Sequence, residues 1–512
     1  MRIFKSIISI FLAICIVLSF AGCKKDEESP QKEENASEEN LSIENVTTNN
    51  NAETHLDVNV ADELEFYYLN LFYQTYSVAY FYETQYGEGT GKMFTGYDVN
   101  LSPEEQTTKN EDGETITFAE YFYEGAVRAM AASEHSDDLA IASGVKLTEE
   151  EKKEIDDAVT TFIENEFVQQ YYNTAVVNEV YKKVLTHIKY TEYYEDMIRE
   201  KCNDADEINS IYEKDKTEYD VVSFRWFTID YDSSAVSEAT AFINKVTSVA
   251  GYSEETFKSV VLETVGEGNS NYEAYKEDNS TKIEKVDKET LEGNVGKDAA
   301  DWFFETDTSG RYVRKSGDIR YFIGEDEESI YIIYATGTPF RDNDILRSVR
   351  HILLKDSTKA EAQKVLDEYL AKAGSGVDEE YFIELVNKYT EDTGSKSNGG
   401  LIADMRNDGR YVSAFEDWAF AEGEFAGQER KPGTTGIVES EYGYHIMFYS
   451  SEYENPAWYE EILDELTDVE WEKINIEVDV EEFEKQNIDS ETKESVIAKC
   501  IETIEKTFGF IA

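Results

Sequence analysis

Two histidines in the C-terminal half of the chain, His351 and His445, are the residues whose type and setting could do chemistry. The chain of 512 residues contains only 5 histidines. Each of the two lies in a short apolar run, residues 348–355 and 444–449, and the second run follows a turn at Gly443. Runs of this length and composition predict strands. Neutral imidazoles on neighbouring strands can share a hydrogen bond, in which each ring fixes the tautomer of the other.

The elements that would position the histidines follow one another up to residue 450. After the first strand, apolar side chains at helical spacing predict two helices. A loop with the sequence TEDTGSKSNGG, a strand, a short helix and two further strands come next. The predicted elements after residues 348–355 lie at 360–372, 379–389, 401–403, 415–420, 436–440 and 444–449. Their order is β-α-α-β-α-β-β.

This order, with its local sequences, resembles the parvulin type of peptidyl-prolyl isomerase. The matching signatures are His-Ile-Leu in the first strand, the Gly399-Gly400 turn, Phe-Glu-x-x-x-Phe in the short helix and Tyr-Gly-Tyr-His-Ile in the last strand. They occur in the order in which the family has them. The resemblance implies a domain over residues 341–452 that catalyses rotation about the peptide bond before proline and uses no cofactor.

The resemblance also implies a set of site residues. His351 and His445 match the paired active-site histidines of the family, and Asp392 stands where the family has Asp or Cys. We therefore expect these three residues to be the catalytic set. The residues expected to bind the substrate are Ile402, Met405 (where Phe is common), Tyr411 (where Met is common), Phe415 and Ser440 (which replaces the usual Thr).

An apolar site suits this reaction because the obstacle is kinetic. Rotation about a peptide bond meets a resonance barrier of ~18–20 kcal/mol, whereas cis and trans X-Pro differ by only ~0.5–1 kcal/mol. The twisted amide has less charge separation than the planar one, so a dry pocket favours it. We assign His351 and His445 structural and tuning roles rather than proton transfer. The alternative is a pair of core histidines without catalysis. We expect no metal, because two His and one Asp at these separations lack a local ligand spacing.

A degenerate copy of the same plan is predicted upstream, over residues 217–340. The residues SFRW at 223–226 parallel SVRH at 348–351, DWFF at 301–304 parallels DWAF at 417–420, and 330–333 parallel 444–447. Trp226 and Tyr331 then take the places of the two histidines. We infer a parvulin-like domain without isomerase activity, used for peptide binding or as a spacer. The alternative is an unrelated α+β linker domain.

The N-terminal region, residues 58–216, is predicted to be helical. Leu64, Tyr67, Tyr68, Leu71 and Phe72 recur at helical spacing. Such tyrosine-rich faces could grip unfolded chains, but for most of them we favour a role in the helical core. Residues 144–151, with an expected capping box from Thr148 to Glu151, resemble the chaperone region of PrsA-type and SurA-type foldases.

The C-terminal segment, residues 453–512, is predicted to form helices at 456–468 and 490–508. In the resembled foldases such helices pack on the N-terminal region, which would bring Cys202 and Cys500 into one domain. Two interpretations stay open for these cysteines: one disulfide, or two separately buried thiols.

Export and membrane attachment are predicted from the first residues. Arg2 and Lys5 precede an apolar run at 7–20, which is short for a membrane span of ~20 residues. The sequence Phe-Ala-Gly-Cys ending at Cys23 resembles the lipobox of bacterial lipoproteins. It implies a signal peptide over residues 1–22, lipid on Cys23, and a location on the extracytoplasmic face of the cell membrane. The alternative is an ordinary signal peptide with an incidental Cys. Residues 23–57 are polar and aperiodic, so we expect a disordered tether.

The predicted fold is an α+β multidomain chain, in which a helical SurA-like chaperone domain accompanies the parvulin-like domains. With 109 acidic and 48 basic residues, the formal charge is −61. Such a chain repels nucleic acid. The expected function is isomerase and chaperone for exported proteins, with unfolded or newly exported polypeptides that contain X-Pro bonds as partners. One alternative is a non-catalytic holdase. A solute-binding lipoprotein is disfavoured because two large βαβ lobes are absent from the pattern.

Overall fold

The computed structural model describes residues 58–110, 113–164, 174–276, 278–324, 328–373, 377–476 and 478–508. The predicted signal peptide, lipidation site and tether lie outside the described residues. The chain divides into two compact units, of which the first comprises Met1–Cys202 with Glu465–Ala512 and the second Asn203–Asp464. Among the described helices, none combines the length and apolar character needed to span a membrane.

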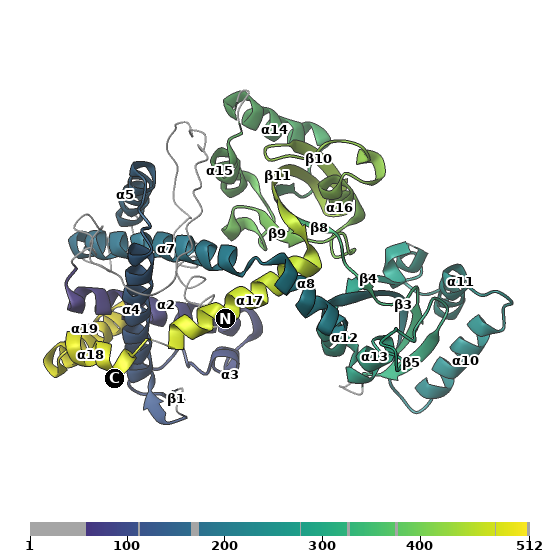
Figure 1. Ribbon diagram of the computed structural model, residues 1–512, viewed down its shortest axis with the longest axis horizontal. Coiled ribbons are helices and arrows are strands. Elements are labelled where there is room, and N and C mark those ends of the chain that lie inside the picture. The colour runs from purple at the N-terminus through teal and green to yellow at the C-terminus, as the bar shows by residue number, and fades with distance from the viewer. Residues whose placement is uncertain are drawn as a thin grey trace. The chain divides into compact units, whose positions relative to one another are not determined.

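The first unit is built mainly of helices (Figure 1). A small hairpin, β1 (Thr107–Lys109) and β2 (Thr115–Thr117), precedes α4. α17 (Ala457–Ile476) belongs to the second unit up to Asp464 and to the first unit from Glu465 onward. The other helices are α2 (Val60–Tyr86), α3 (Thr90–Thr95), α4 (Phe118–Ala142), α5 (Glu149–Ile163), α7 (Thr174–Cys202), α18 (Val480–Asn487) and α19 (Ser490–Phe508).

The core of the first unit joins its N-terminal and C-terminal helices. Leu64 and Phe72 of α2, Phe122 of α4, Val180 of α7 and Ile504 of α19 belong to one buried apolar cluster. The first and last helices of the described residues therefore share one core. α5 starts with the predicted capping box, in which the side chains of the N-cap residue and the third helical residue bond to each other's backbone N–H.

Cys202 and Cys500, the two cysteines of the described residues, are not joined by a disulfide. Cys500 is buried in the core of the first unit. Cys202 is partly exposed, and its thiol lies 3.7 Å from the carbonyl oxygen of Leu466. The structure therefore does not show the disulfide, and of the two thiols expected to be buried, only that of Cys500 is fully buried.

The second unit contains two antiparallel sheets. The first has the strand order β4-β3-β6-β5, with β7 paired to β3, and the second has the order β10-β11-β8-β9. The first sheet and its helices are α8 (Ala205–Lys214), α9 (Lys216–Tyr219), β3 (Asp220–Asp230), α10 (Ala235–Thr247), α11 (Glu254–Val265), η1 (Ala274–Lys276), η2 (Asp278–Thr281), β4 (Lys282–Val286), α12 (Lys288–Val295), α13 (Lys297–Phe303), β5 (Ile319–Ile323), β6 (Ser329–Ala335) and β7 (Phe340–Arg341).

The second sheet is formed by the segment that carries the histidines. Its elements are β8 (Ile345–Leu354), α14 (Lys359–Ala373), α15 (Glu379–Tyr389), η3 (Lys396–Asn398), β9 (Leu401–Met405), α16 (Ser413–Phe420), η4 (Gly423–Phe425), β10 (Thr435–Ser440) and β11 (Gly443–Pro456). The order β-α-α-β-α-β-β is the predicted one.

Alternation along the two central strands gives this sheet two different apolar faces. Ile352 of β8 and Ile446 and Phe448 of β11 pack in one cluster with residues of α14 and α15. Val349 and Met447 have the opposite parity and pack with residues of α16. His351 and His445 share this second parity, so both histidines point to the α16 side of the sheet.

Candidate active site

The pairing of β8 with β11 brings the two histidines together. His351 lies opposite Met447, and His445 lies opposite Leu353, so the histidines are diagonal neighbours on adjacent strands. Their Nδ1 atoms are 3.1 Å apart, and each residue is only 5% exposed. The rings are nearly parallel, with 26° between their planes.

A chain of polar contacts extends from both sides of the pair. The Nε2 atom of His351 lies 3.1 Å from Asp392 Oδ2 and 3.1 Å from Ser395 Oγ. The Ser395 hydroxyl donates to the same carboxylate oxygen at 2.5 Å. On the other side, Ser440 Oγ lies 2.7 Å from Nε2 of His445.

One proton arrangement satisfies every contact in this chain. A charged Asp392 accepts a hydrogen bond, so Nε2 of His351 carries the proton and its Nδ1 is the acceptor. Nδ1–H of His445 then donates to His351, and the Ser440 hydroxyl donates to Nε2 of His445. The tautomers follow from the hydrogen-bond network rather than from observed hydrogens.

Electrostatics keep both rings neutral and the carboxyl group charged. Burial lowers the pKa of His351, against the opposing effect of Asp392. Burial, and then the neighbouring His351, lowers the pKa of His445 to about 4. Burial would raise the pKa of Asp392, but hydrogen bonds from Ser395 and the Gly394 N–H outweigh it, and this pKa is lowered. A neutral pair agrees with a tuning role and leaves no imidazolium for proton donation near pH 7.

An apolar wall stands beside the histidines. It consists of Ile402, Met405, Tyr411 and Phe415, which all belong to one cluster. The Phe415 ring meets both imidazoles edge-on, with centroids 5.2 Å from His351 and 5.4 Å from His445. Tyr411 stacks on Phe415 at 5.7 Å. Met405 and Phe415 are buried, whereas Ile402 and Tyr411 are partly exposed, so a ligand would meet the latter two first.

The structure thus brings all of the expected catalytic and substrate-binding residues into one neighbourhood. Sequence reasoning missed two residues that build it. Ser395 bonds both to His351 and to Asp392, and the spacing Asp-x-x-Ser in the loop was the available signal. The second is Glu416, the residue after Phe415 in the short helix.

Glu416 of α16 binds the backbone turn that carries Tyr411 of the apolar wall. Its two carboxylate oxygens accept hydrogen bonds from the backbone N–H groups of Gly409 at 3.1 Å and Tyr411 at 3.0 Å. The residue is buried, and burial raises its pKa to about 7. Because the same carboxylate holds both ends of the turn before α16, it fixes the backbone that carries Tyr411.

The glycine turn before β9 has a steric reason. Gly400 has φ +73°, and a Cβ atom at this position would lie 2.4 Å from the carbonyl oxygen of His351. The N–H of His351 donates to the carbonyl of Gly400 at 2.9 Å. The backbone of β9 therefore approaches β8 more closely than a side chain would allow.

The first sheet of the second unit has the same strand register, but aromatic residues occupy the two positions that correspond to the histidines. Trp226 lies opposite Ile333, and Thr228 lies opposite Tyr331, which is the pairing pattern of His351 and His445. The Trp226 and Tyr331 rings stack 5.6 Å apart with 12° between their planes. Within the described residues, no group of three or more His, Cys, Asp or Glu side chains is placed to hold a metal ion, here or in the second sheet.

Comparison with known proteins identifies the segment that holds the histidines. Residues 345–450 match the Rotamase family model, described as a PPIC-type PPIASE domain. Foldase protein PrsA 1 of Listeria monocytogenes is 30% identical over 196 residues, which cover 38% of this chain and 56% of the relative. Foldase protein PrsA 3 of Bacillus cereus is 39% identical over 99 residues, 19% of this chain and 29% of the relative.

These matches confirm the parvulin resemblance and the relation to PrsA foldases. The chain spans about half the length of the first of these relatives. The crystal structure of PrsA from Bacillus subtilis is 14% identical and covers 78% of this chain and 93% of its own, with a TM-score of 0.18.

Proposed function

We propose that this chain, which carries a PPIC-type isomerase domain, is a peptidyl-prolyl cis-trans isomerase and chaperone that assists the folding of exported proteins. The observation that carries the proposal is the geometry of the neutral histidine pair. His351 and His445 share a hydrogen bond in a buried setting, and Phe415 lies edge-on to both rings. The matched family segment encloses all of these residues.

In the proposed mechanism the site accelerates rotation without forming a covalent bond. The proline ring lies against Ile402 and Tyr411, with Met405 and Phe415 behind them. The planar amide places partial negative charge on its oxygen, and rotation removes that charge separation. A dry wall and neutral imidazoles therefore favour the twisted state over the planar one. The charged Asp392 fixes the tautomer of His351 and, through it, that of His445.

Attachment to the membrane is the finer part of the proposal. The lipobox-like sequence that ends at Cys23 and the basic residues Arg2 and Lys5 support a lipid anchor on the extracytoplasmic face. A Cys23→Ala variant should then be released from the membrane fraction. Retention of that variant in the membrane fraction would reject lipidation of Cys23 as the anchor.

A proline-isomerisation assay on a tetrapeptide tests the catalytic proposal. We expect kcat/KM to fall at least about tenfold in His445→Ala and in Asp392→Ala, because each change breaks the network that fixes the tautomers. Glu439→Ala is the matched control, since this exposed carboxylate lies on β10 of the same sheet. Circular dichroism checks that each variant is folded. Wild-type rates in both folded variants would reject this active site and favour a holdase.

A further inference from the structure

Large apolar side chains are exposed where α2 ends and α3 follows it. Phe81, Tyr86, Met93 and Phe94 are 53%, 67%, 69% and 58% exposed. Tyr82 connects the three aromatic residues among them, because its ring stacks on Phe94 at 4.5 Å and lies 5.7 Å from Phe81 and 5.9 Å from Tyr86. We call these five residues the α2–α3 aromatic patch. Monomeric proteins rarely expose contiguous apolar groups of this kind without a function.

The patch is not a continuation of the helical core. In α2 the buried side chains lie between Glu63 and Phe72, with Ala79 as the last one. The aromatic pattern nevertheless continues to Tyr86. The sequence left open whether the tyrosine-rich faces form the core or grip unfolded chains. The structure divides them: the first half of α2 is core, and its end is exposed.

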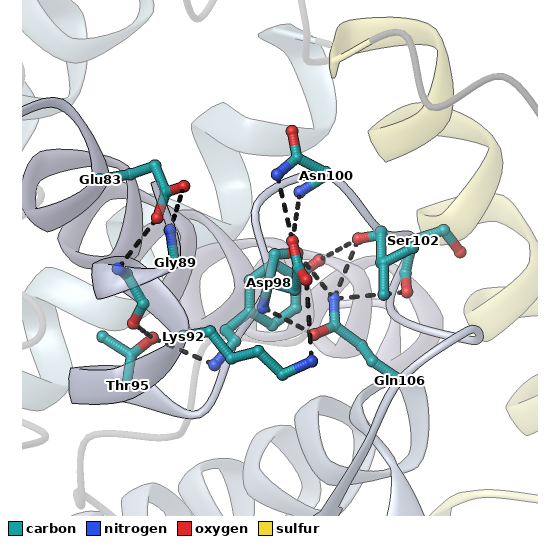
Figure 2. A network of polar contacts seen from close by, with 11 residues as sticks. Glu83, Gly89, Lys92, Thr95, Asp98, Asn100, Ser102 and Gln106 are labelled. Atoms are coloured by element: carbon teal, nitrogen blue, oxygen red, sulfur yellow. Dashed lines mark hydrogen bonds and ion pairs between the residues drawn. The ribbon is translucent and has the colours of Figure 1, made fainter. Parts of the chain in front are cut away.

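A polar network fixes the backbone that carries the patch. Figure 2 shows the Glu83 carboxylate at the N–H groups that begin α3: Gly89 donates to it at 2.7 Å and Gly91 at 3.0 Å. The Thr90 hydroxyl donates to the carbonyl oxygen of Tyr82 at 2.8 Å. A Cβ atom on Gly91 would lie 2.4 Å from the carbonyl oxygen of Ala79, so the two helices touch through their backbones. A surface fixed in this way loses little entropy when it binds a partner.

The composition of the patch indicates a partner of variable apolar sequence. Tyr and Phe rings offer a large contact area at a low entropy cost. Met93, one of only 6 methionines in the chain, is a flexible side chain that adapts to different shapes. Surfaces of this composition suit many sequences rather than one.

Charge selects among apolar partners. Beside the patch, Glu88 is exposed, and Lys92 forms an ion pair with Asp98 while its side chain stays 57% exposed. The whole chain carries a formal charge of −61. The resulting field repels anionic lipid surfaces and attracts cationic chains.

We propose that the α2–α3 aromatic patch binds apolar segments of unfolded, cationic polypeptides. This inference rests on the proposed function, because it names the surface that the chaperone activity would use. It differs from that function in requiring no proline, since the patch contains neither of the histidines.

The probe is a fluorescein-labelled peptide of alternating Lys and Phe that contains no proline. Its affinity for the full chain is measured by fluorescence anisotropy. We expect the double variant Phe81→Ser/Phe94→Ser to bind at least about tenfold more weakly. The matched control is Tyr231→Ser, because Tyr231 is a 40% exposed aromatic residue that follows β3 in the other unit. A peptide with Glu in place of Lys should bind more weakly to the wild type.

The outcomes separate this proposal from the proposed function. Unchanged peptide affinity in the folded double variant would overturn the proposal that the patch binds peptides, whatever the isomerase assay shows. Tetrapeptide isomerisation should be normal in the same variant. A benzophenone-labelled probe should crosslink to α2 and α3 of the wild type, and crosslinks confined to other elements would also overturn the proposal. If the wild type is a dimer and the double variant a monomer, the patch mediates self-association instead, and the proposal of a peptide site is rejected.

Discussion

At the residue scale, the site depends on one unbroken sequence of hydrogen bonds from Asp392 through His351 and His445 to Ser440. The two histidines could be predicted because the short apolar runs that carry them resemble the first and last strands of the parvulin family. Ser395 could not be predicted in the same way. Its contact with His351 depends on how the loop after α15 folds back, and loop conformation leaves no periodic signal in the sequence.

His445 and Glu416 predict opposite effects of pH on the stability of this domain. The folded pKa of His445, about 4, lies below its ordinary value of 6.5, so its contribution to stability is complete above pH 6.5 and is lost as the pH falls toward 4. The folded pKa of Glu416, about 7, lies above its ordinary value of 4.5, so its contribution to stability is present below pH 4.5 and is lost as the pH rises through 7. Between pH 7 and pH 5 each group changes the free energy of unfolding by roughly 2 kcal/mol. The two changes have opposite signs and nearly cancel.

Replacing Glu416 by Gln should remove this compensation. On acidification from pH 7 to 5, the free energy of unfolding should fall by about 2 kcal/mol more in Glu416→Gln than in the wild type. Urea unfolding, followed by amide hydrogen exchange in β8 and β11, separates this domain from the rest of the chain. Glu439→Gln, an exposed change in the same sheet, should follow the wild type. Identical pH profiles for Glu416→Gln and the wild type would show that burial does not perturb this carboxyl group.

At the element scale, apolar spacing predicted the helices that have a buried apolar face and missed a helix that has none. The helix expected at 490–508 is α19, Ser490–Phe508. α18 was not predicted, because none of its described side chains is fully buried and its two apolar residues, Val480 and Phe483, are too few to form a recognisable pattern. The helix expected at 456–468 continues to Ile476 as α17. Its extension carries the exposed Val469, which interrupts the apolar pattern.

Close packing of β9 against β8 predicts that Gly400 tolerates no side chain. Gly400→Ala would place a Cβ atom 2.4 Å from the carbonyl oxygen of His351, in addition to a left-handed backbone that costs about 1–2 kcal/mol. Gly427→Ala is the matched control, because Gly427 has φ +80° and nothing within 4 Å of an added Cβ atom. We expect Gly400→Ala to lose more stability than the control and to lose isomerase activity. Equal urea midpoints for the two variants would contradict the close approach of the strands.

At the scale of the whole molecule, the second unit uses one sheet plan twice. Both sheets run through four strands in the corresponding order, and the residue pairs Trp226–Tyr331 and His351–His445 have the same register. The repeat could be found in the sequence because SFRW parallels SVRH. That the two aromatic rings stack could not be read from the sequence, since rotamers depend on the neighbours that the fold supplies. The shared plan supports our proposal that residues 217–340 form a degenerate parvulin-like domain.

The two sheets should therefore respond separately to substitution. Trp226→Ala removes an aromatic stack worth about 0.5–1.5 kcal/mol beyond its buried area, so hydrogen exchange in β3 and β6 should become faster. Exchange in β8 and β11 should not change, and tetrapeptide isomerisation should keep its wild-type rate, because the hydrogen bonds of the histidine network involve no residue of the first sheet. His351→Ala should give the converse pattern. A fall in isomerase rate in folded Trp226→Ala would mean that the first sheet takes part in catalysis. That result would contradict the separate roles of the two sheets.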